Sequence, residues 1–313
     1  MTDPVEILVD SAAASAAAAQ SASPWSVLIR NPSVIIGGVI MLLMTLTALL
    51  APWLGTMDPS SIDPTNRNKR PGAETMVIDS SGHETVRVYR MGTDSLGRDV
   101  YSRVIYGARV SLVIGVTVAV LSVLAGLAIG LVAGYIRWVD SLVMRFLDGL
   151  MAIPGILLAI ALVSVWGSGL ATVLLAIMIP EIPRVVRLVR SIVLSVREEP
   201  YVESAISVGT PLPKILVRHV LPNTLAPLIV QGTYVCASAI LVEAILSFLG
   251  AGIPPETPTW GNIMAEGRVL FRVFPHNTLF PGIFLALTVL GVNMLGDGLR
   301  DTLDPRLAKR LRV

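Results

Sequence analysis

Six long stretches of apolar residues divide the chain and alternate with polar segments. They cover residues 33–54, 110–135, 143–166, 170–190, 223–250 and 278–298. About 20 residues of helix cross the hydrocarbon core of a bilayer, which is about 30 Å thick. Helix is the expected conformation because lipid offers the backbone no hydrogen-bond partners. The pattern therefore predicts an all-α integral membrane protein with six transmembrane helices.

Segment 55–109 holds several lysines and arginines, but it is a long loop, in which basic residues say little about orientation. Elsewhere, lysine and arginine gather near the ends of the predicted spans on one side. The residues concerned are Arg30, Arg137, Arg145, Arg197, Lys214, Arg218, Arg306, Lys309, Arg310 and Arg312. Basic residues near the ends of membrane spans favour the cytoplasmic side. Both termini are therefore predicted to be cytoplasmic, while segments 55–109 and 251–277 face outward.

The chain accordingly divides into five predicted parts. They are a cytoplasmic N-terminal tail (1–32), a first transmembrane helix (33–54), an outer loop (55–109), a core with five further transmembrane helices (110–300) and a cytoplasmic C-terminal tail (301–313). The N-terminal tail lacks the basic start and strongly apolar centre of a signal peptide. We expect it to stay in the cytoplasm.

The outer loop has a pattern of its own. The stretch TMVIDSSGHETVRVYR, within 74–90, predicts two short strands around a Ser-Ser-Gly-His turn. Residues 97–112 are amphipathic, with Val100, Val104 and Ile105 opposed to Arg98, Asp99 and Arg103. This second pattern predicts a helix lying on the membrane surface before the second span.

The overall composition agrees with a membrane protein. Hydrophobic residues make up 53% of the chain, charged residues 15%, and the mean hydropathy is +0.72, whereas soluble domains contain about 25% charged residues. A net charge of only +2 disfavours nucleic acid as a partner. The one cysteine, Cys236, excludes an internal disulfide.

Asp148, Glu181 and Glu243 lie within the apolar stretches, where charge is costly and indicates a polar interior or a functional role. Asp148 follows Arg145 by three residues, so that the two are expected to neutralise each other. Glu181 stands near the middle of its span. Glu243 fits both an interior hydrogen bond and a place on a translocation path. All three are candidates for the path or for interior charges.

Glycine and proline indicate how the helices pack. Gly126, Gly130 and Gly134 share one face of a helix, and small residues at this spacing let membrane helices approach closely. Packing within the chain is the simpler expectation, and a seam between two chains is the alternative. The three prolines that interrupt the third and fourth spans, Pro154, Pro180 and Pro183, predict bends around a cavity.

Sequence motifs for catalysis or for cofactors are missing. The sequence has no G-x-x-x-x-G-K-[ST] phosphate loop and no H-E-x-x-H motif. His83, His219 and His276 are far apart in the sequence. The chain is therefore expected not to be an enzyme, and to bind neither a metal nor a cofactor.

Segment 191–222 is much longer than a simple turn between two spans. PYVESAIS predicts a short helix, Gly209 permits a turn that other residues resist, and Pro213 suits the first turn of a second helix, PKILVRHV. Two short helices at an angle form a rigid knob outside the membrane. The knob is either a docking surface for another protein or an amphipathic element resting on lipid.

The sequence VESAISVG, followed twelve residues on by LPN, resembles the EAA loop of ABC importer permeases. Ser204 replaces the second alanine of the family pattern. In that family the loop seats in a cleft of a cytoplasmic ATPase subunit. The resemblance implies ATPase coupling by Tyr201, Glu203, Ser204, Ala205, Gly209, Lys214, Arg218, Val220, Leu221 and Pro222.

Further stretches resemble the C-subunit of dipeptide/oligopeptide (Dpp/Opp) permeases. They are RNPSVIIGGVIMLLMTLTALLAPWL, MGTDSLGRDVYSRVIYGARVSL, EAILSFLGAGIPPETPTWGNIM and NMLGDGLRDTLDPR. The hairpin 74–90 replaces a shorter link of the family, so the outer surface is expected to differ.

The resemblance implies a type I importer permease in the inner membrane. It implies a homologous partner permease forming a heterodimer, two P-loop ATPase subunits that use ATP, and an external substrate-binding protein. The substrate, a di- or oligopeptide or a related small solute, is not determined by these residues. The alternative is a self-contained secondary transporter or a channel subunit, which would need no ATPase.

Overall fold

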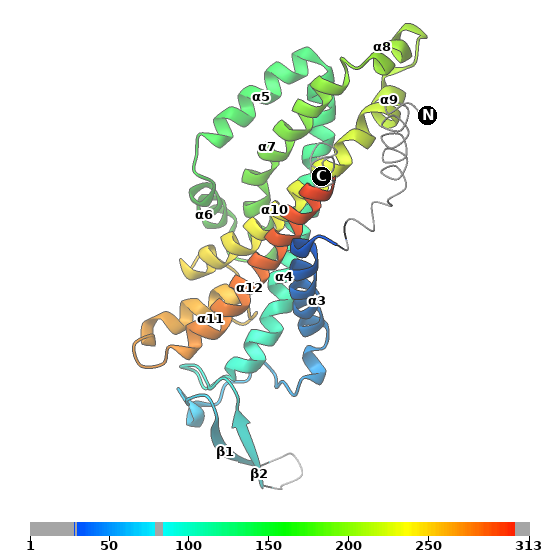
Figure 1. Cartoon of the computed structure of the whole chain (residues 1–313). Helices are drawn as coiled ribbons and strands as arrows, with labels where there is room; N and C mark the ends of the chain where they lie inside the picture. The colour runs from blue at the N-terminus through cyan, green and yellow to red at the C-terminus, as the bar shows by residue number, and fades with distance from the viewer. Residues whose placement is uncertain (1–27, 29, 79–83, 304–313) are drawn as a thin grey trace, which may run out of the picture.

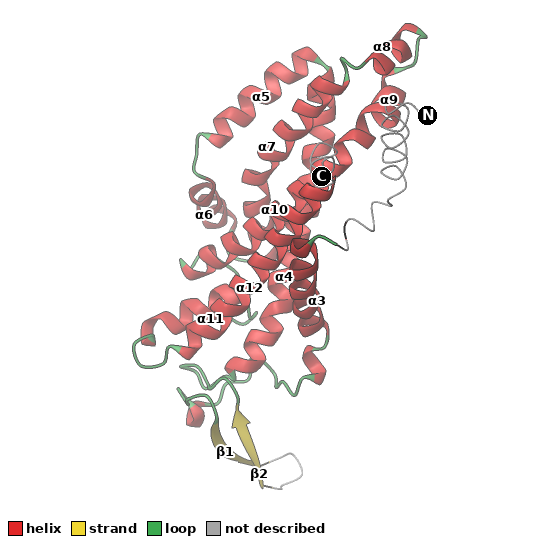
Figure 2. Ribbon diagram, viewed as in Figure 1, coloured by secondary structure: helices red, strands yellow, loops and turns green. Residues whose placement is uncertain are grey.

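The computed structural model describes residues 28, 30–78 and 84–303 and shows an elongated bundle of long helices (Figures 1 and 2). Most of the two predicted tails, and the predicted turn of the hairpin, lie outside these residues. The helices are α3 (Pro32–Leu49), α4 (Val100–Tyr135), α5 (Arg137–Met151), α6 (Gly155–Trp166), α7 (Leu170–Val196), α8 (Pro200–Ser207), α9 (Leu212–Ile215), α10 (Leu221–Phe248), α11 (Trp260–Gly267) and α12 (His276–Leu303).

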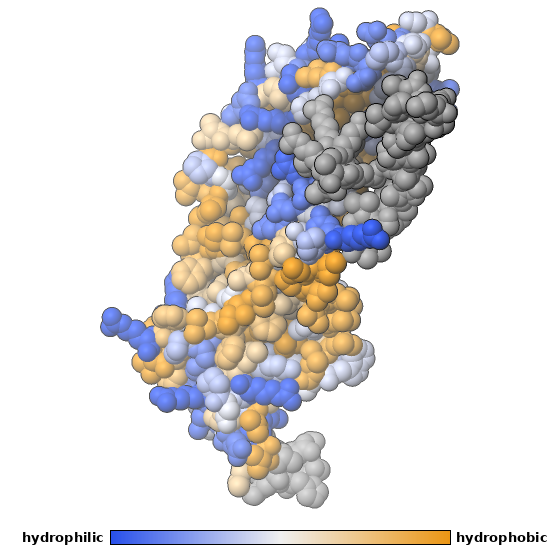
Figure 3. Space-filling model, in the orientation of Figure 1, coloured by the Kyte–Doolittle hydropathy of each residue, from blue (hydrophilic) through white to orange (hydrophobic). Residues whose placement is uncertain are grey.

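Four helical segments of the described chain are long and apolar enough to cross a membrane. They are α3, α4, the continuous helical segment Leu212–Phe248 and α12. The helices α5 and α6 count as a fifth when taken together. Figure 3 shows apolar residues gathered in a middle zone of the molecule, between two ends with more hydrophilic residues. The all-α membrane fold predicted from the sequence is confirmed at this level.

The predicted third span, 143–166, is wrong as a single straight helix. The helices α5 and α6 meet at an angle of 88°. Pro154 stands at the break in an extended conformation, with φ −55° and ψ 127°. Proline has no N–H for a helical hydrogen bond and its ring clashes with the preceding turn. The helix therefore ends at Met151 and restarts at Gly155.

The fourth predicted span corresponds to α7, which is 27 residues long. It does not stand among the four apolar helices, and its C-terminal half carries three arginines, Arg184, Arg187 and Arg190. Their side chains form ion pairs with acidic residues of α5 and α7. Pairing of this kind lowers the cost of charge in a membrane domain.

The glycine face of α4 packs against α7. A Cβ atom on Gly126, Gly130 or Gly134 would lie 2.5 to 2.7 Å from the Cβ atoms of valines on α7. The valines are Val185, Val189 and Val193, which are fully buried. Side chains on α4 at these positions would hold the two helices apart. The structure thus supports the intramolecular alternative for this glycine pattern.

The two strands of the predicted hairpin are present. They are β1 (Ala73–Ile78) and β2 (Glu84–Tyr89), paired antiparallel with Ala73 opposite Tyr89. They project from one end of the bundle, below the start of α4 (Figure 1). We call this the hairpin end.

The predicted surface helix at 97–112 is wrong. Residues 100–135 form one continuous helix of 36 residues, α4, capped by the side chain of Asp99. Arg98 and Arg103 are as buried as the valines opposite them. An amphipathic pattern predicts one exposed face, but here ion pairs with other segments of the chain cover the charged face.

Candidate functional site

The helix α8 stands at the end of the molecule opposite the hairpin (Figure 1). Pro200 occupies its first turn, where a missing N–H costs nothing. The side chain of Val202 is fully buried and anchors the helix. Gly209 follows with φ of +84°, in the left-handed region that favours glycine. A Cβ atom at Gly209 would meet no atom within 4 Å, so the backbone angle alone favours glycine there.

The second predicted helix of this segment is not separate. The helix α9 starts with Pro213 in its first turn and continues through a π-helical turn, Leu216–Val220, into α10. Pro222 has no N–H to donate to Arg218, which favours a wider turn at this point. Leu212–Phe248 is therefore one long helical segment. The predicted pair of short helices reduces to one short helix, α8, set on the end of a long one.

The predicted coupling residues divide into an exposed and an anchored group. Tyr201, Glu203, Ser204, Gly209, Lys214, Arg218 and Pro222 are exposed, Ala205 and Leu221 are half-buried, and Val220 is fully buried. Prediction from the sequence missed Val208, which is 87% exposed at the turn after α8. It also missed Asn223, whose Nδ2 donates to the backbone oxygen of His219 at 2.6 Å.

Large apolar side chains are exposed around this turn. Ile206, Val208 and Val217 are 47%, 87% and 64% exposed. They stand beside charged residues at an end of the molecule that Figure 3 shows to be rich in hydrophilic residues. Apolar groups with a polar rim are typical of a surface that binds another protein.

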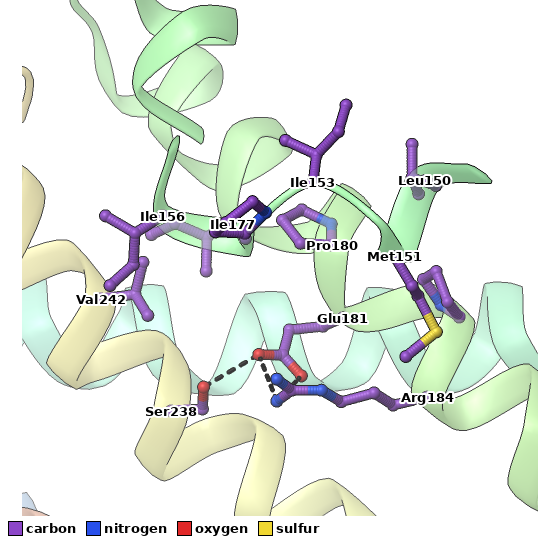
Figure 4. Close-up of a pocket in the computed structure, with 13 residues that line it drawn as sticks. Leu150, Met151, Ile153, Ile156, Ile177, Pro180, Glu181, Arg184, Ser238 and Val242 are labelled. Carbon is purple, nitrogen blue, oxygen red and sulfur yellow. Dashed lines mark hydrogen bonds and ion pairs between the residues drawn. The ribbon is translucent and has the colours of Figure 1, made fainter. Parts of the chain in front are cut away.

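A cavity of about 430 Å³ lies between the break of α5 and α6, the middle of α7 and α10. Pro154, Pro180 and Pro183 are part of its wall, as predicted. Only Pro154 stands at a break, because Pro180 and Pro183 lie inside the continuous helix α7. The wall is mainly apolar and contains one ion pair (Figure 4). The carboxylate of Glu181 accepts hydrogen bonds from Ser238 Oγ at 2.9 Å and from Arg184 Nη1 at 3.3 Å.

Asp148 does not pair with Arg145, contrary to the prediction. Its carboxylate accepts from Arg187 Nη2 of α7 at 2.6 Å. Asp140 of α5 likewise binds Arg190, with Arg190 Nη2 2.7 Å from Oδ2. On a helix, residues three apart share a side only approximately, and α5 also packs against α7. These two ion pairs therefore link α5 to α7, outside the cavity wall.

Glu243 is fully buried in α10. One carboxylate oxygen accepts a hydrogen bond from Ser247 Oγ at 2.8 Å, and the other has no hydrogen-bond partner among the described residues. Glu243 is not among the residues that line the cavity, although its neighbour Val242 is. The geometry favours the interior hydrogen bond over the translocation path.

An ion cluster that the sequence did not predict lies near the hairpin end. Arg98 Nε is 2.7 Å from Asp94 Oδ2, and its guanidinium also binds Glu266 of α11. Arg103 Nη2 is 3.2 Å from Glu266, and its side chain is 1% exposed. Burial raises the pKa of Glu266, while the two guanidinium groups oppose that shift. The cluster fastens the start of α4 to α11.

The tryptophan of the sequence PPETPTWG reinforces this junction. Trp260 is fully buried at the start of α11, and its indole N–H donates to the backbone oxygen of Val104 at 3.1 Å. Thr259 and Asn262 cap the helix reciprocally.

Comparison with known proteins agrees with this architecture. Residues 122–309 match the family described as binding-protein-dependent transport system inner membrane component. Residues 20–71 match the N-terminal transmembrane domain of oligopeptide transport permease C.

Three relatives illustrate the breadth of the similarity. A probable peptide ABC transporter permease of Sinorhizobium fredii is 49% identical over 281 residues, 90% of this chain and 91% of the relative. A dipeptide transport system permease of Alkalihalophilus pseudofirmus is 41% identical, over 91% of each chain. A glutathione transport system permease of Pectobacterium atrosepticum is 39% identical, over 90% of each. The chain therefore belongs to the family of binding-protein-dependent transport system inner membrane components, as a non-catalytic, multi-pass permease subunit of an ATP-driven importer.

Proposed function

We propose that this chain forms one half of the translocation path of an importer for peptides or related small solutes, and that α8 couples it to an ATPase. The relatives named above are permeases for peptides, dipeptides and glutathione. These compounds share free amino and carboxylate groups. A homologous permease would supply the other half of the path, and an external binding protein would deliver the substrate.

The observation that carries the proposal is the long helical segment Leu212–Phe248. It begins beside α8 and contributes Ser238 and Val242 to the wall of the cavity. At 1.5 Å per residue, about 39 Å separates Leu212 from Ser238 along the helix. A helix of this kind transmits a displacement at α8 to the cavity as a rigid lever.

In this mechanism two ATPase subunits bind ATP, and closure of the pair moves α8 together with its counterpart on the partner permease. The lever then tilts α10 against α7 and exposes the cavity alternately to the two sides of the membrane. ATP acts only on the partner subunits, since this sequence has no phosphate loop. This chain itself binds no cofactor.

The proposal includes an orientation. Basic residues near α8, such as Arg197, Lys214 and Arg218, support a cytoplasmic position for that end, and the predicted topology gives both termini the same side. The hairpin end and α11 then face outward, where the binding protein docks.

The experiment that tests the proposal is purification of the tagged chain, expressed with its neighbouring genes, in mild detergent. A second permease and P-loop ATPase subunits are expected to co-purify. Proteoliposomes of the complex with its binding protein are expected to accumulate dialanine or glutathione only with ATP. A chain that purifies alone and transports without ATP would contradict the proposal and favour a secondary transporter or a channel.

A further inference from the structure

The cavity contains one charged pair that membrane helices do not need for packing. Glu181 is 6% exposed in the middle of α7. Twelve residues of helix place it about 17 Å from the start of α7, near half the thickness of a bilayer core. Charge at this depth is costly and is typical of a substrate path.

The two members of the pair are held very differently. Glu181 is buried and fixed by Ser238 Oγ at 2.9 Å. The side chain of Arg184 is 58% exposed, and its Nη1 is 3.3 Å from both carboxylate oxygens. These are longer than the about 2.7–2.9 Å of a strong charge-assisted bond. The carboxylate is thus a fixed site, and the guanidinium is a loosely held counter-ion.

The surroundings suit a small polar guest. The cavity of about 430 Å³ is within the range of about 300–1,000 Å³ that is usual for ligand sites. Part of its wall is the break between α5 and α6, and the continuous helices α7, with two prolines at this level, and α10 complete it. In membrane transporters, broken helices near the bilayer centre commonly form the substrate site.

From these observations we propose that Glu181 and Arg184 form an exchange site for zwitterionic peptides. The ammonium group of the passing peptide replaces Arg184 on the carboxylate of Glu181, with Ser238 keeping that carboxylate in place. The released guanidinium of Arg184 binds the carboxylate of the same peptide. Every charge has a partner before and after the exchange, so that no unpaired charge is left in the membrane interior. This inference rests on the proposed import of peptides.

Thiol protection in the assembled complex measures occupancy of this site directly. Cys236 is replaced by alanine and Val242, in the cavity wall, by cysteine, which leaves the charged pair intact. A neutral methanethiosulfonate reagent then labels the complex in lipid nanodiscs with and without dialanine. Dialanine at ten times its half-protection concentration is expected to slow labelling about tenfold. N-acetyl-dialanine methylamide, which has the same backbone without the charges, is expected to give no protection.

Charge variants identify the groups responsible. Glu181→Gln is expected to raise the half-protection concentration of dialanine about tenfold or more, because the ammonium group loses a charged partner. Asp148→Asn removes a carboxylate of α5 that lies outside the cavity wall, and is expected to leave the protection unchanged.

Two results would overturn the inference while leaving the proposed function standing. One is ATP-dependent uptake of dialanine by a complex in which dialanine and its blocked analogue protect the cysteine equally. The other is equal half-protection by dialanine in the Cys236→Ala, Val242→Cys complex with and without Glu181→Gln. If no ATPase subunit co-purified and uptake did not depend on ATP, the proposed function itself would be refuted.

Discussion

Replacing Gly130 with alanine is expected to push α4 and α7 apart. The new Cβ atom would lie 2.7 Å from Val189 Cβ, 2.9 Å from its Cγ1 and 3.0 Å from the backbone oxygen of Val186. Carbon atoms in favourable contact are about 3.5–4.0 Å apart. Because two of these neighbours are fixed to the backbone of α7, no side-chain rotation relieves the contact, and the helices must separate by about 1 Å.

Overpacking of this kind costs about 1–3 kcal/mol in a well-packed core. By the scaling of soluble domains, this corresponds to a fall in the melting temperature of about 2–10 °C. This fall in melting temperature is measured by thermal unfolding of the purified complex in mild detergent. Gly232→Ala is the matched control, since a Cβ atom there would lie at an ordinary 3.7 Å from Val123 Cγ2 in α4. Equal melting temperatures of the two variants would refute the close packing of α4 on α7.

Three further predictions concern the two ends of the molecule and its interior. Gly209→Val is expected to abolish substrate-stimulated ATP hydrolysis without loss of complex assembly, because φ of +84° costs a β-branched residue more than about 1–2 kcal/mol. Gly209→Asn is the control and is expected to retain activity. Normal stimulation of ATP hydrolysis in the valine variant would contradict this prediction. Glu266→Gln leaves two buried guanidinium groups with one carboxylate and is expected to destabilise the complex by about 3 kcal/mol in thermal unfolding. Glu256→Gln, at an exposed position, is the control. Equal stability of the two variants would contradict a stabilising role of the ion cluster. Glu243→Gln keeps a hydrogen-bond acceptor for Ser247 and is expected to retain wild-type uptake and complex yield; loss of uptake at normal yield would restore a path role for Glu243.

The apolar pattern of the sequence was sufficient to predict the membrane fold. Long runs without charge leave helix as the only conformation that satisfies the backbone in lipid, and α3, α4, α10 and α12 follow these runs closely. The glycines of α4 were also informative, because only a close neighbour requires small residues at that spacing. The partner helix, α7, is determined by tertiary packing and was therefore not predictable.

Charged residues were harder to place from the sequence. Arg98 and Arg103 form one side of an amphipathic pattern, and such a pattern does not distinguish water from a buried counter-ion supplied by a distant segment. Glu266, which supplies it, is more than 160 residues away in the chain. The sequence pairs Asp148 with Arg145, its neighbour on the same helix, whereas its partner Arg187 lies on α7 and is brought close only by tertiary packing.

In the coupling segment 191–222, some local features were predicted correctly from the sequence, and the continuity of the helices was not. Gly209 and Pro213 occupy the turn and the first helical turn that their backbone properties favour. The continuity of α9 with α10 was missed because the prolines 211, 213 and 222 all suggest interruptions. Pro211 is the N-cap of α9, Pro213 lies in its first turn, and a π turn accommodates Pro222 without ending the helix.

The most direct test of the account is photo-crosslinking from the tip of the α8 turn. Val208, 87% exposed, is replaced by a photoreactive amino acid, and Met76 of the hairpin, 73% exposed, serves as the matched site at the other end. The complex is irradiated and the adducts are identified by mass spectrometry. We predict that position 208 joins a P-loop ATPase subunit and that position 76 does not. Absence of an ATPase adduct at position 208, or equal adducts at both positions, would contradict coupling through α8.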